Sequence, residues 1–187
     1  MPTSQAMPGW RVFLGDREQS VVLHNSWTAG TANASIFGPH DTSMLEGSYS
    51  ALLQAGIDPS GPNLPFLEAS LVQTGLVPQD AVFLQFRMAR FTGGLPQIGP
   101  FRVELDGQRI AVAPLFVHPN YTLFGGDVSA FAGTTADLRF IAETSQLPNN
   151  ILLDSILFVP VPEPSTLALL STGLICFAAY IRKRSRR

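Results

Sequence analysis

The dipeptide Asp106-Gly107 constrains the fold more than any other feature, because it separates two short runs of β-forming residues, 101–105 and 108–112. Aspartate followed by glycine readily takes the two positive φ angles of a type I′ turn, whose twist matches that of paired strands. The pattern predicts a tight β-hairpin. It also predicts that Asp106 and Glu104 are turn and strand-surface residues rather than catalytic acids.

Similar short runs recur along the chain, separated by turn residues instead of helical patterns. In the strongest run, residues 81–91, Val82, Leu84, Phe86 and Met88 alternate with a mixed set, as in a half-buried antiparallel strand. The other expected strands are 10–14 and 20–24 (a hairpin with its turn at 15–17), 34–37, 49–53, 68–74, 115–117, 121–124, 136–143 and 151–158. A single helical turn is expected at 127–133, where Asp127 can cap the free amides.

The composition agrees with an all-β fold: sixteen glycines, fifteen prolines and only 14% charged residues. We therefore expect residues 1–158 to form one antiparallel, jelly-roll-like β-sandwich, the outer domain. It holds seven arginines and no lysine against thirteen acids, a formal charge of 7 − 13 = −6, which argues against a nucleic-acid partner. The sole cysteine, Cys176, lies outside it, so no disulfide within the chain can stabilise the domain.

Residues 159–187 have a different organisation. The tripeptide Pro162-Glu163-Pro164 precedes an apolar run, 167–181, which predicts a single transmembrane helix of about 22 Å, short of the ~30 Å hydrocarbon core. The run is followed by a basic tail of Arg182, Lys183, Arg184, Arg186 and Arg187. The positive-inside rule places this tail in the cytosol and the outer domain across the membrane. An ordinary single-pass anchor, or an amphiphilic helix packed on a soluble domain, are the alternatives.

The order of motif, apolar run and basic tail closely resembles the PEP-CTERM sorting signal of Gram-negative bacteria. The resemblance implies that an exosortase, an integral membrane enzyme, recognises Pro162, Glu163 and Pro164 and processes the chain at or near them. The basic tail would then be a stop-transfer signal. The implied route leads through the inner membrane to the cell surface or extracellular matrix.

Such exported proteins begin with a signal peptide that has a basic region and an apolar region of 7 to 15 residues. Residues 1–14 have neither, and Pro8-Gly9-Trp10 is typical of the interior of a domain. We therefore expect the natural N-terminus to lie upstream of Met1.

A second resemblance covers most of the outer domain. Residues 125–158, together with Pro8-Gly9-Trp10 and residues 45–53, are similar to the galactose-binding-like jelly rolls often found before PEP-CTERM tails. That resemblance implies sugar binding, adhesion or a structural role. It also implies a structural Ca²⁺ in some members, for which Asp154 is the candidate ligand here, because its charge lies amid an apolar strand.

No residue pattern indicates catalysis. His24, His40 and His118 lack zinc-site spacing, and there is no nucleophile elbow, phosphate loop or cysteine pair. We therefore expect a non-enzymatic surface or matrix protein that contributes to adhesion or to an exopolysaccharide matrix. The alternative is a carbohydrate-binding module, for which Trp10, Trp27 and Tyr49 could form a stacking platform, against the simpler prediction that they belong to the core.

Overall fold

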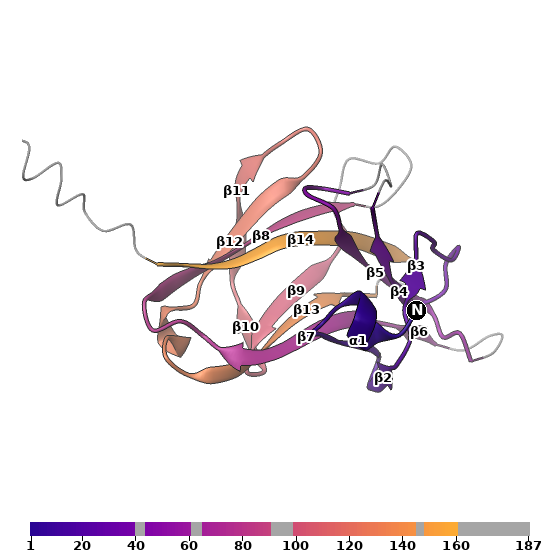
Figure 1. The fold of residues 1–187 in the computed structure, drawn as a ribbon, viewed down its shortest axis with the longest axis horizontal. Coiled ribbons are helices and arrows are strands. Elements are labelled where there is room, and N and C mark those ends of the chain that lie inside the picture. The colour runs from indigo at the N-terminus through magenta and orange to yellow at the C-terminus, as the bar shows by residue number, and fades with distance from the viewer. Residues whose placement is uncertain (40–43, 61–64, 91–98, 145–147, 161–187) are drawn as a thin grey trace, which may run out of the picture.

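The computed structural model describes residues 1–39, 44–60, 65–90, 99–144 and 148–160. These residues form a β-sandwich of two facing sheets (Figure 1). The smaller sheet has six strands in the order β10-β9-β13-β7-β1-β2, and the larger has eight, in the order β11-β12-β8-β14-β5-β4-β3 with β6 paired to β5. The predicted all-β sandwich is confirmed.

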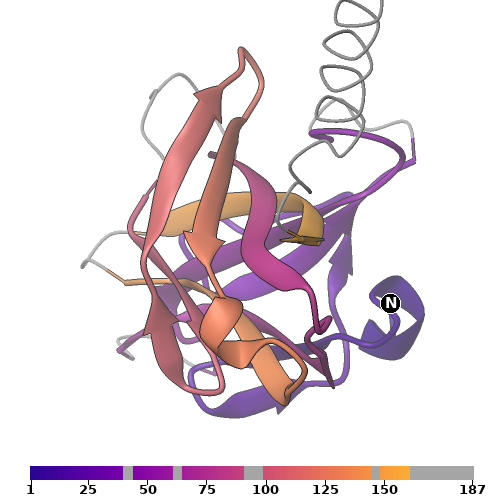
Figure 2. The ribbon, with the colours of Figure 1, turned by 90° about the vertical axis from the view of Figure 1, so that its left-hand side faces the viewer.

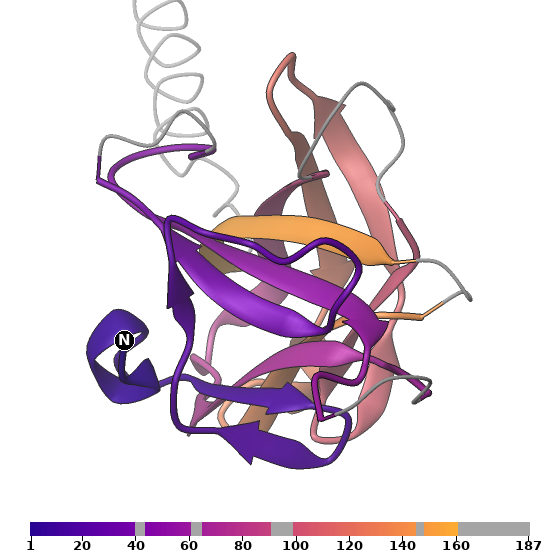
Figure 3. The same cartoon turned by 90° about the vertical axis from the view of Figure 1, so that its right-hand side faces the viewer.

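The smaller sheet consists of β1 (Arg11–Leu14), β2 (Arg17–Gln19), β7 (Ala69–Leu76), β9 (Phe101–Leu105), β10 (Gln108–Ile110) and β13 (Thr135–Ala142). The larger consists of β3 (Leu23–His24), β4 (Asn33–Phe37), β5 (Ser50–Ile57), β6 (Phe66–Leu67), β8 (Ala81–Arg90), β11 (Val112–Val117), β12 (Thr122–Asp127) and β14 (Asn149–Pro160). Helical structure in the described residues is limited to α1 (Thr3–Ala6) and the 3₁₀ turn η1 (Ser129–Phe131). Figure 3 shows the β11–β12 hairpin projecting beyond the body of the sandwich.

The predicted Asp-Gly hairpin is confirmed. Asp106 and Gly107 have φ angles of 51° and 74°, and Leu105 pairs with Gln108. The predicted turn after β12 is confirmed as η1: the Asp127 carboxylate accepts hydrogen bonds from the Ser129 amide (2.8 Å) and hydroxyl (2.7 Å).

The first predicted hairpin is wrong in its second strand. Leu14 pairs directly with Arg17, so the turn consists of Gly15 and Asp16 alone and β2 starts at Arg17 instead of Ser20. After β2 the chain crosses to the larger sheet, where β3 pairs in parallel with β4, so that sheet is mixed. Burial of Val22, at 3% exposure, accompanies the crossing.

The predicted strand 108–112 is also two strands. The chain leaves the smaller sheet after Ile110, and Val112 begins β11 in the larger sheet (Figure 2). The side chains of Ile110 and Val112 both pack closely against Gly126 on β12, where a residue with a Cβ atom would collide with them. A strand-to-strand crossing of this kind leaves no turn signal in the sequence.

Aromatic rings fill the core between the sheets. Leu84, Phe86 and Met88 of β8 are fully buried, which confirms the predicted alternation, whereas Phe83 on the opposite face is 42% exposed. The Phe86 ring stacks on Phe124 at 5.7 Å between centroids and meets Phe140 edge-on at 5.0 Å. Such aromatic pairs contribute about 0.5–1.5 kcal/mol each beyond the burial of their area.

Among the described residues, no helix is long and apolar enough to cross a membrane. The run 167–181, for which a transmembrane helix is predicted, lies outside them.

Phe86→Ala is expected to destabilise the sandwich by about 3–5 kcal/mol, since it empties the centre of the aromatic core. Phe83→Ala, on the exposed face of the same strand, is the matched control and should cost less than about 1 kcal/mol. Urea unfolding of the intact chain in detergent, followed by near-ultraviolet circular dichroism, measures both. Equal losses would show that Phe86 is not the centre of the core.

Candidate functional site

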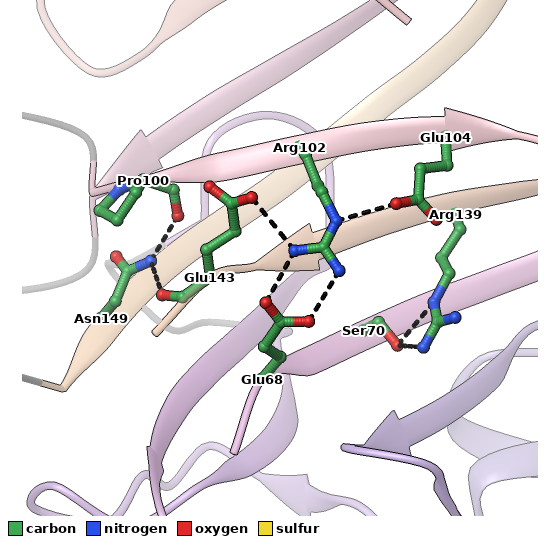
Figure 4. A network of polar contacts seen from close by, with 8 residues as sticks. All are labelled: Glu68, Ser70, Pro100, Arg102, Glu104, Arg139, Glu143 and Asn149. Carbon is green, nitrogen blue, oxygen red and sulfur yellow. Dashed lines mark hydrogen bonds and ion pairs between the residues drawn. The ribbon is translucent and has the colours of Figure 1, made fainter. Parts of the chain in front are cut away.

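The open face of the smaller sheet carries a polar network centred on Arg102 of β9 (Figure 4). Its guanidinium donates two parallel hydrogen bonds to Glu68, both of 2.7 Å, from Nη1 and Nη2. It also donates from Nε to Glu104 (2.8 Å) and from Nη1 to Glu143 (3.1 Å). One cation therefore joins residues from three parts of the chain, because β7, β13 and β9 are neighbours in the sheet.

The network is only partly exposed, which strengthens its electrostatics. The Arg102 side chain is 22% exposed, and its hydrogen bonds lower the pKa of Glu68 against the opposing effect of burial. The same bonds raise the pKa of Arg102, with Glu68 the largest cause. The Glu68–Arg102 pair is thus charged at neutral pH, and Arg102 occupies the space between the three carboxylates.

Asn149 connects this network to the larger sheet. Its side-chain amide donates hydrogen bonds to the backbone carbonyls of Pro100 (2.7 Å) and Glu143 (2.9 Å), and the residue is buried. Because Asn149 begins β14, the bonds join the start of the last strand of the larger sheet to the segments that flank the network (Figure 4).

Beside the network lies a groove of about 270 Å³, lined by Arg11, Phe13, Val72, Glu104, Gly107, Asp137 and Arg139. The guanidinium carbons of Arg11 and Arg139 lie 5.5 Å and 5.7 Å from the centroid of the Phe13 ring. Arg139 also donates from Nε and Nη2 to the Ser70 hydroxyl. The groove thus combines a half-buried aromatic ring, two cations and two carboxylates, the side chains that hydrogen-bond and stack on sugar-like ligands.

Sequence reasoning missed both the network and the groove. Arg102 and Glu104 alternate on one strand, which places them on a common face, but nothing local indicates that Glu68 lies beside them. Their meeting depends on the strand order, with β13 between β9 and β7.

Asp154, the candidate Ca²⁺ ligand, lies on the open face of the larger sheet. Its Oδ2 accepts hydrogen bonds from the Ser50 hydroxyl (2.7 Å) and the Glu46 amide (3.1 Å), and Glu46 forms an ion pair with Arg87. Asp154 therefore has the partners that its charge requires. In the part of the chain that the structure describes, no three acidic, histidine or cysteine side chains cluster as metal ligands, and Ca²⁺ binding at Asp154 stays a prediction.

The predicted aromatic platform is divided between core and surface. Trp10 packs against Phe140, with 6.4 Å between ring centroids, and belongs to the core. Trp27 and Tyr49 are 46% and 53% exposed. Of the histidines, His24 shares a hydrogen bond with the Gly38 carbonyl, His118 stacks on Tyr121, and His40 lies outside the described residues.

The predicted sorting residues Pro162, Glu163 and Pro164 and the basic tail also lie outside the described residues, directly after β14. A comparison with protein families matches residues 160–184 to the PEP-CTERM protein-sorting motif. The chain carries a PEP-CTERM sorting motif. No curated protein and no solved structure matches the chain.

The sorting motif implies recognition by an exosortase-type processing enzyme, and passage through the membrane before export to the cell surface. The match covers the three predicted recognition residues and the first three basic residues of the tail, Arg182, Lys183 and Arg184. Because the motif begins at Pro160, where β14 ends, the described sandwich lies almost entirely before it.

Arg102→Gln is expected to destabilise the protein by roughly 2 kcal/mol at pH 7, since it leaves three carboxylates together without their donor. The pKa of Glu68 is lower in the folded state than in the unfolded state, so ionised Glu68 stabilises the fold at pH values above its unfolded-state pKa, near 4.5. This stabilisation is lost as the pH falls below 4.5 and through the folded-state pKa. The difference between variant and wild type should therefore shrink in acid.

Arg11→Gln, which removes the exposed ion pair with Asp137 on the same sheet, is the matched control and should cost less than about 1 kcal/mol. Urea unfolding at pH 7 and pH 4 measures these effects. A loss for Arg102→Gln that is small, or that does not change with pH, would contradict the network's role.

Proposed function

We propose that this chain is a non-enzymatic surface or extracellular-matrix protein, exported and sorted through its PEP-CTERM motif. Its β-sandwich contributes to adhesion or to the exopolysaccharide matrix. The observation that carries the proposal is the motif at residues 160–184, which begins where the last strand of the sandwich ends. A sandwich followed directly by a sorting motif is the arrangement expected of a folded body delivered to the cell surface.

The polar groups of the described residues support a role without catalysis. The lowered pKa of Asp58, about 2, results from hydrogen bonds with Arg17 and Ser60, and that of Asp127 from Ser129 in the η1 turn. Glu68 is held by Arg102. Each perturbed carboxylate thus has a structural partner.

A second candidate function is a carbohydrate-binding module with a defined glycan site. The groove beside Phe13 favours it, because Arg11 and Arg139 supply donors and Glu104 and Asp137 supply acceptors around one aromatic ring. The two cations and two carboxylates balance, and Arg11 pairs with Asp137, so the groove favours hydrogen bonds with the hydroxyl groups of a neutral glycan.

Cell fractionation of the native host tests the sorting proposal. The intact chain is compared with the triple variant Pro162→Ala/Glu163→Ala/Pro164→Ala for mass and location. We expect the intact chain outside the inner membrane with a lower mass, and the variant in the membrane at full length. If both remain in the membrane at full length, the C-terminal segment is a simple single-pass anchor and the matrix proposal loses its support.

Affinity electrophoresis in gels containing neutral or uronate-bearing polysaccharide tests the glycan site. Phe13→Ala should weaken retention several-fold to about tenfold, as expected for a stacking contact of about 1 kcal/mol. Phe83→Ala, an exposed phenylalanine on the other sheet, should leave retention unchanged. Equal retention of wild type and Phe13→Ala would exclude the groove, and no retention of any chain would exclude polysaccharide binding.

A further inference from the structure

The open face of the larger sheet carries an apolar cluster next to the end of β14 that no other described residue covers. We call it the tail-proximal patch; its exposed members are Phe83 (42%), Leu115 (53%), Phe116 (60%) and Leu157 (58%). Leu123 and Val159, both half-buried, lie among them. Four exposed large apolar side chains, from the neighbouring strands β8 and β14 and the edge strand β11, form a patch, not scattered surface residues.

Strand register places these side chains on one face. Phe83 pairs with Val159, and Gln85 pairs with both Leu157 and Gly125, and directly paired residues point to the same side of a sheet. Their neighbours Leu84 and Phe158 point the other way, into the core.

The edge strand extends the same face. Leu115 lies over Gly125, where an added Cβ would stand 2.6 Å from its Cδ1 atom. Phe116 pairs with Leu123, which pairs with Arg87, two residues from Gln85. The patch therefore runs from β14 across β8 and β12 to β11.

The other half of this face is covered by the chain itself. Phe37, Leu52 and Leu152 form a second buried cluster there, with Leu45 and Ala89 packed against it. The hydrogen bonds from Glu46 and Ser50 to Asp154 fasten the covering segment to β14. The described residues leave only the half towards residue 160 open.

The chain leaves the sandwich at that open half. Pro160 ends β14 and pairs with Ala81, two residues from Phe83. Six residues, 161–166, separate Pro160 from the apolar run at 167–181. Six residues span at most about 21 Å even when fully extended. When the run is in the membrane, the patch is therefore within reach of the headgroup layer.

We propose that the tail-proximal patch docks on the lipid surface of the membrane while the chain is still attached to its C-terminal segment. The patch itself carries no charge. The nearby Arg87 is paired with Glu46, and its guanidinium carbon lies 4.9 Å from the centroid of the Tyr121 ring. Phenylalanine, leucine and an adjacent tyrosine are suited to the interface of a bilayer. Docking holds residues 160–164 at the membrane surface, where a membrane-embedded processing enzyme can reach them.

The inference rests on the membrane passage that the sorting motif implies, and is independent of polysaccharide binding. While the C-terminal segment is in the membrane, even a small patch is sufficient for binding to the lipid surface, because the short tether gives the patch a high effective concentration there. Once the chain is cut, the patch alone holds the sandwich weakly, and release follows.

The test uses the full chain in proteoliposomes of phosphatidylcholine, with Cys176→Ala and one new cysteine, Leu157→Cys or Phe83→Cys, that carries a nitrobenzoxadiazole fluorophore. Quenching by headgroup-proximal spin-labelled lipid is compared with quenching by aqueous iodide. Val21→Cys is the matched control, since Val21 is 60% exposed and bridges Pro2 beside the N-terminus, which lies at the other end of the sandwich from the end of β14 (Figure 1).

We expect lipid quenching at residues 83 and 157 to exceed that at residue 21 at least about threefold, with iodide quenching in the reverse order. Equal iodide quenching at all three positions would overturn the proposal. So would protection from both quenchers at 83 and 157, which would identify a second copy of the chain as the occupant. A chain that is exported and processed normally but gives either result rejects the docking alone and leaves the sorting proposal intact.

Discussion

The larger sheet depends on the pairing of β14 with strands on both of its sides. Residues 149–153 pair with β5, and residues 151–160 pair with β8, so β14 holds two otherwise separate groups of strands together. Its inward side chains, among them the fully buried Ile151, complete the core, and Asn149 joins it to the smaller sheet. Without β14 the sandwich would have two open edges in the middle of one layer, where unpaired backbone groups would meet water or other chains.

The two outer faces of the sandwich have opposite chemistry. On the smaller sheet, charged side chains form the Arg102 network and the groove beside Phe13. On the larger sheet, the chain's own residues cover one half, and the other half is apolar and not covered by any described residue. A body with one polar and one apolar face can meet two different surroundings at once, a hydrated polymer on one side and a lipid surface on the other.

Local signals allowed much of the fold to be predicted. Asp106-Gly107 has its own backbone preference, and the alternation in β8 directly reflects which side chains face the core. The sorting motif was equally readable because its parts are consecutive in the sequence. What could not be predicted depends on which strands become neighbours: Glu68 and Arg102 are 34 residues apart, and their contact requires β13 between them. The crossings after Gln19 and Ile110 were missed for the same reason, since a change of sheet leaves no residue preference of its own.

The position of β14 also sets the order in which the molecule can mature. The strand that closes the larger sheet is the last of the described strands, and the sorting motif begins at its final residue. A chain delivered only in part therefore has an incomplete sheet, and a chain that has presented its motif has already delivered every described strand. Cutting anywhere after Pro160 leaves every described strand intact. Folding and sorting are thus linked by chain order alone, and the motif follows a finished sandwich.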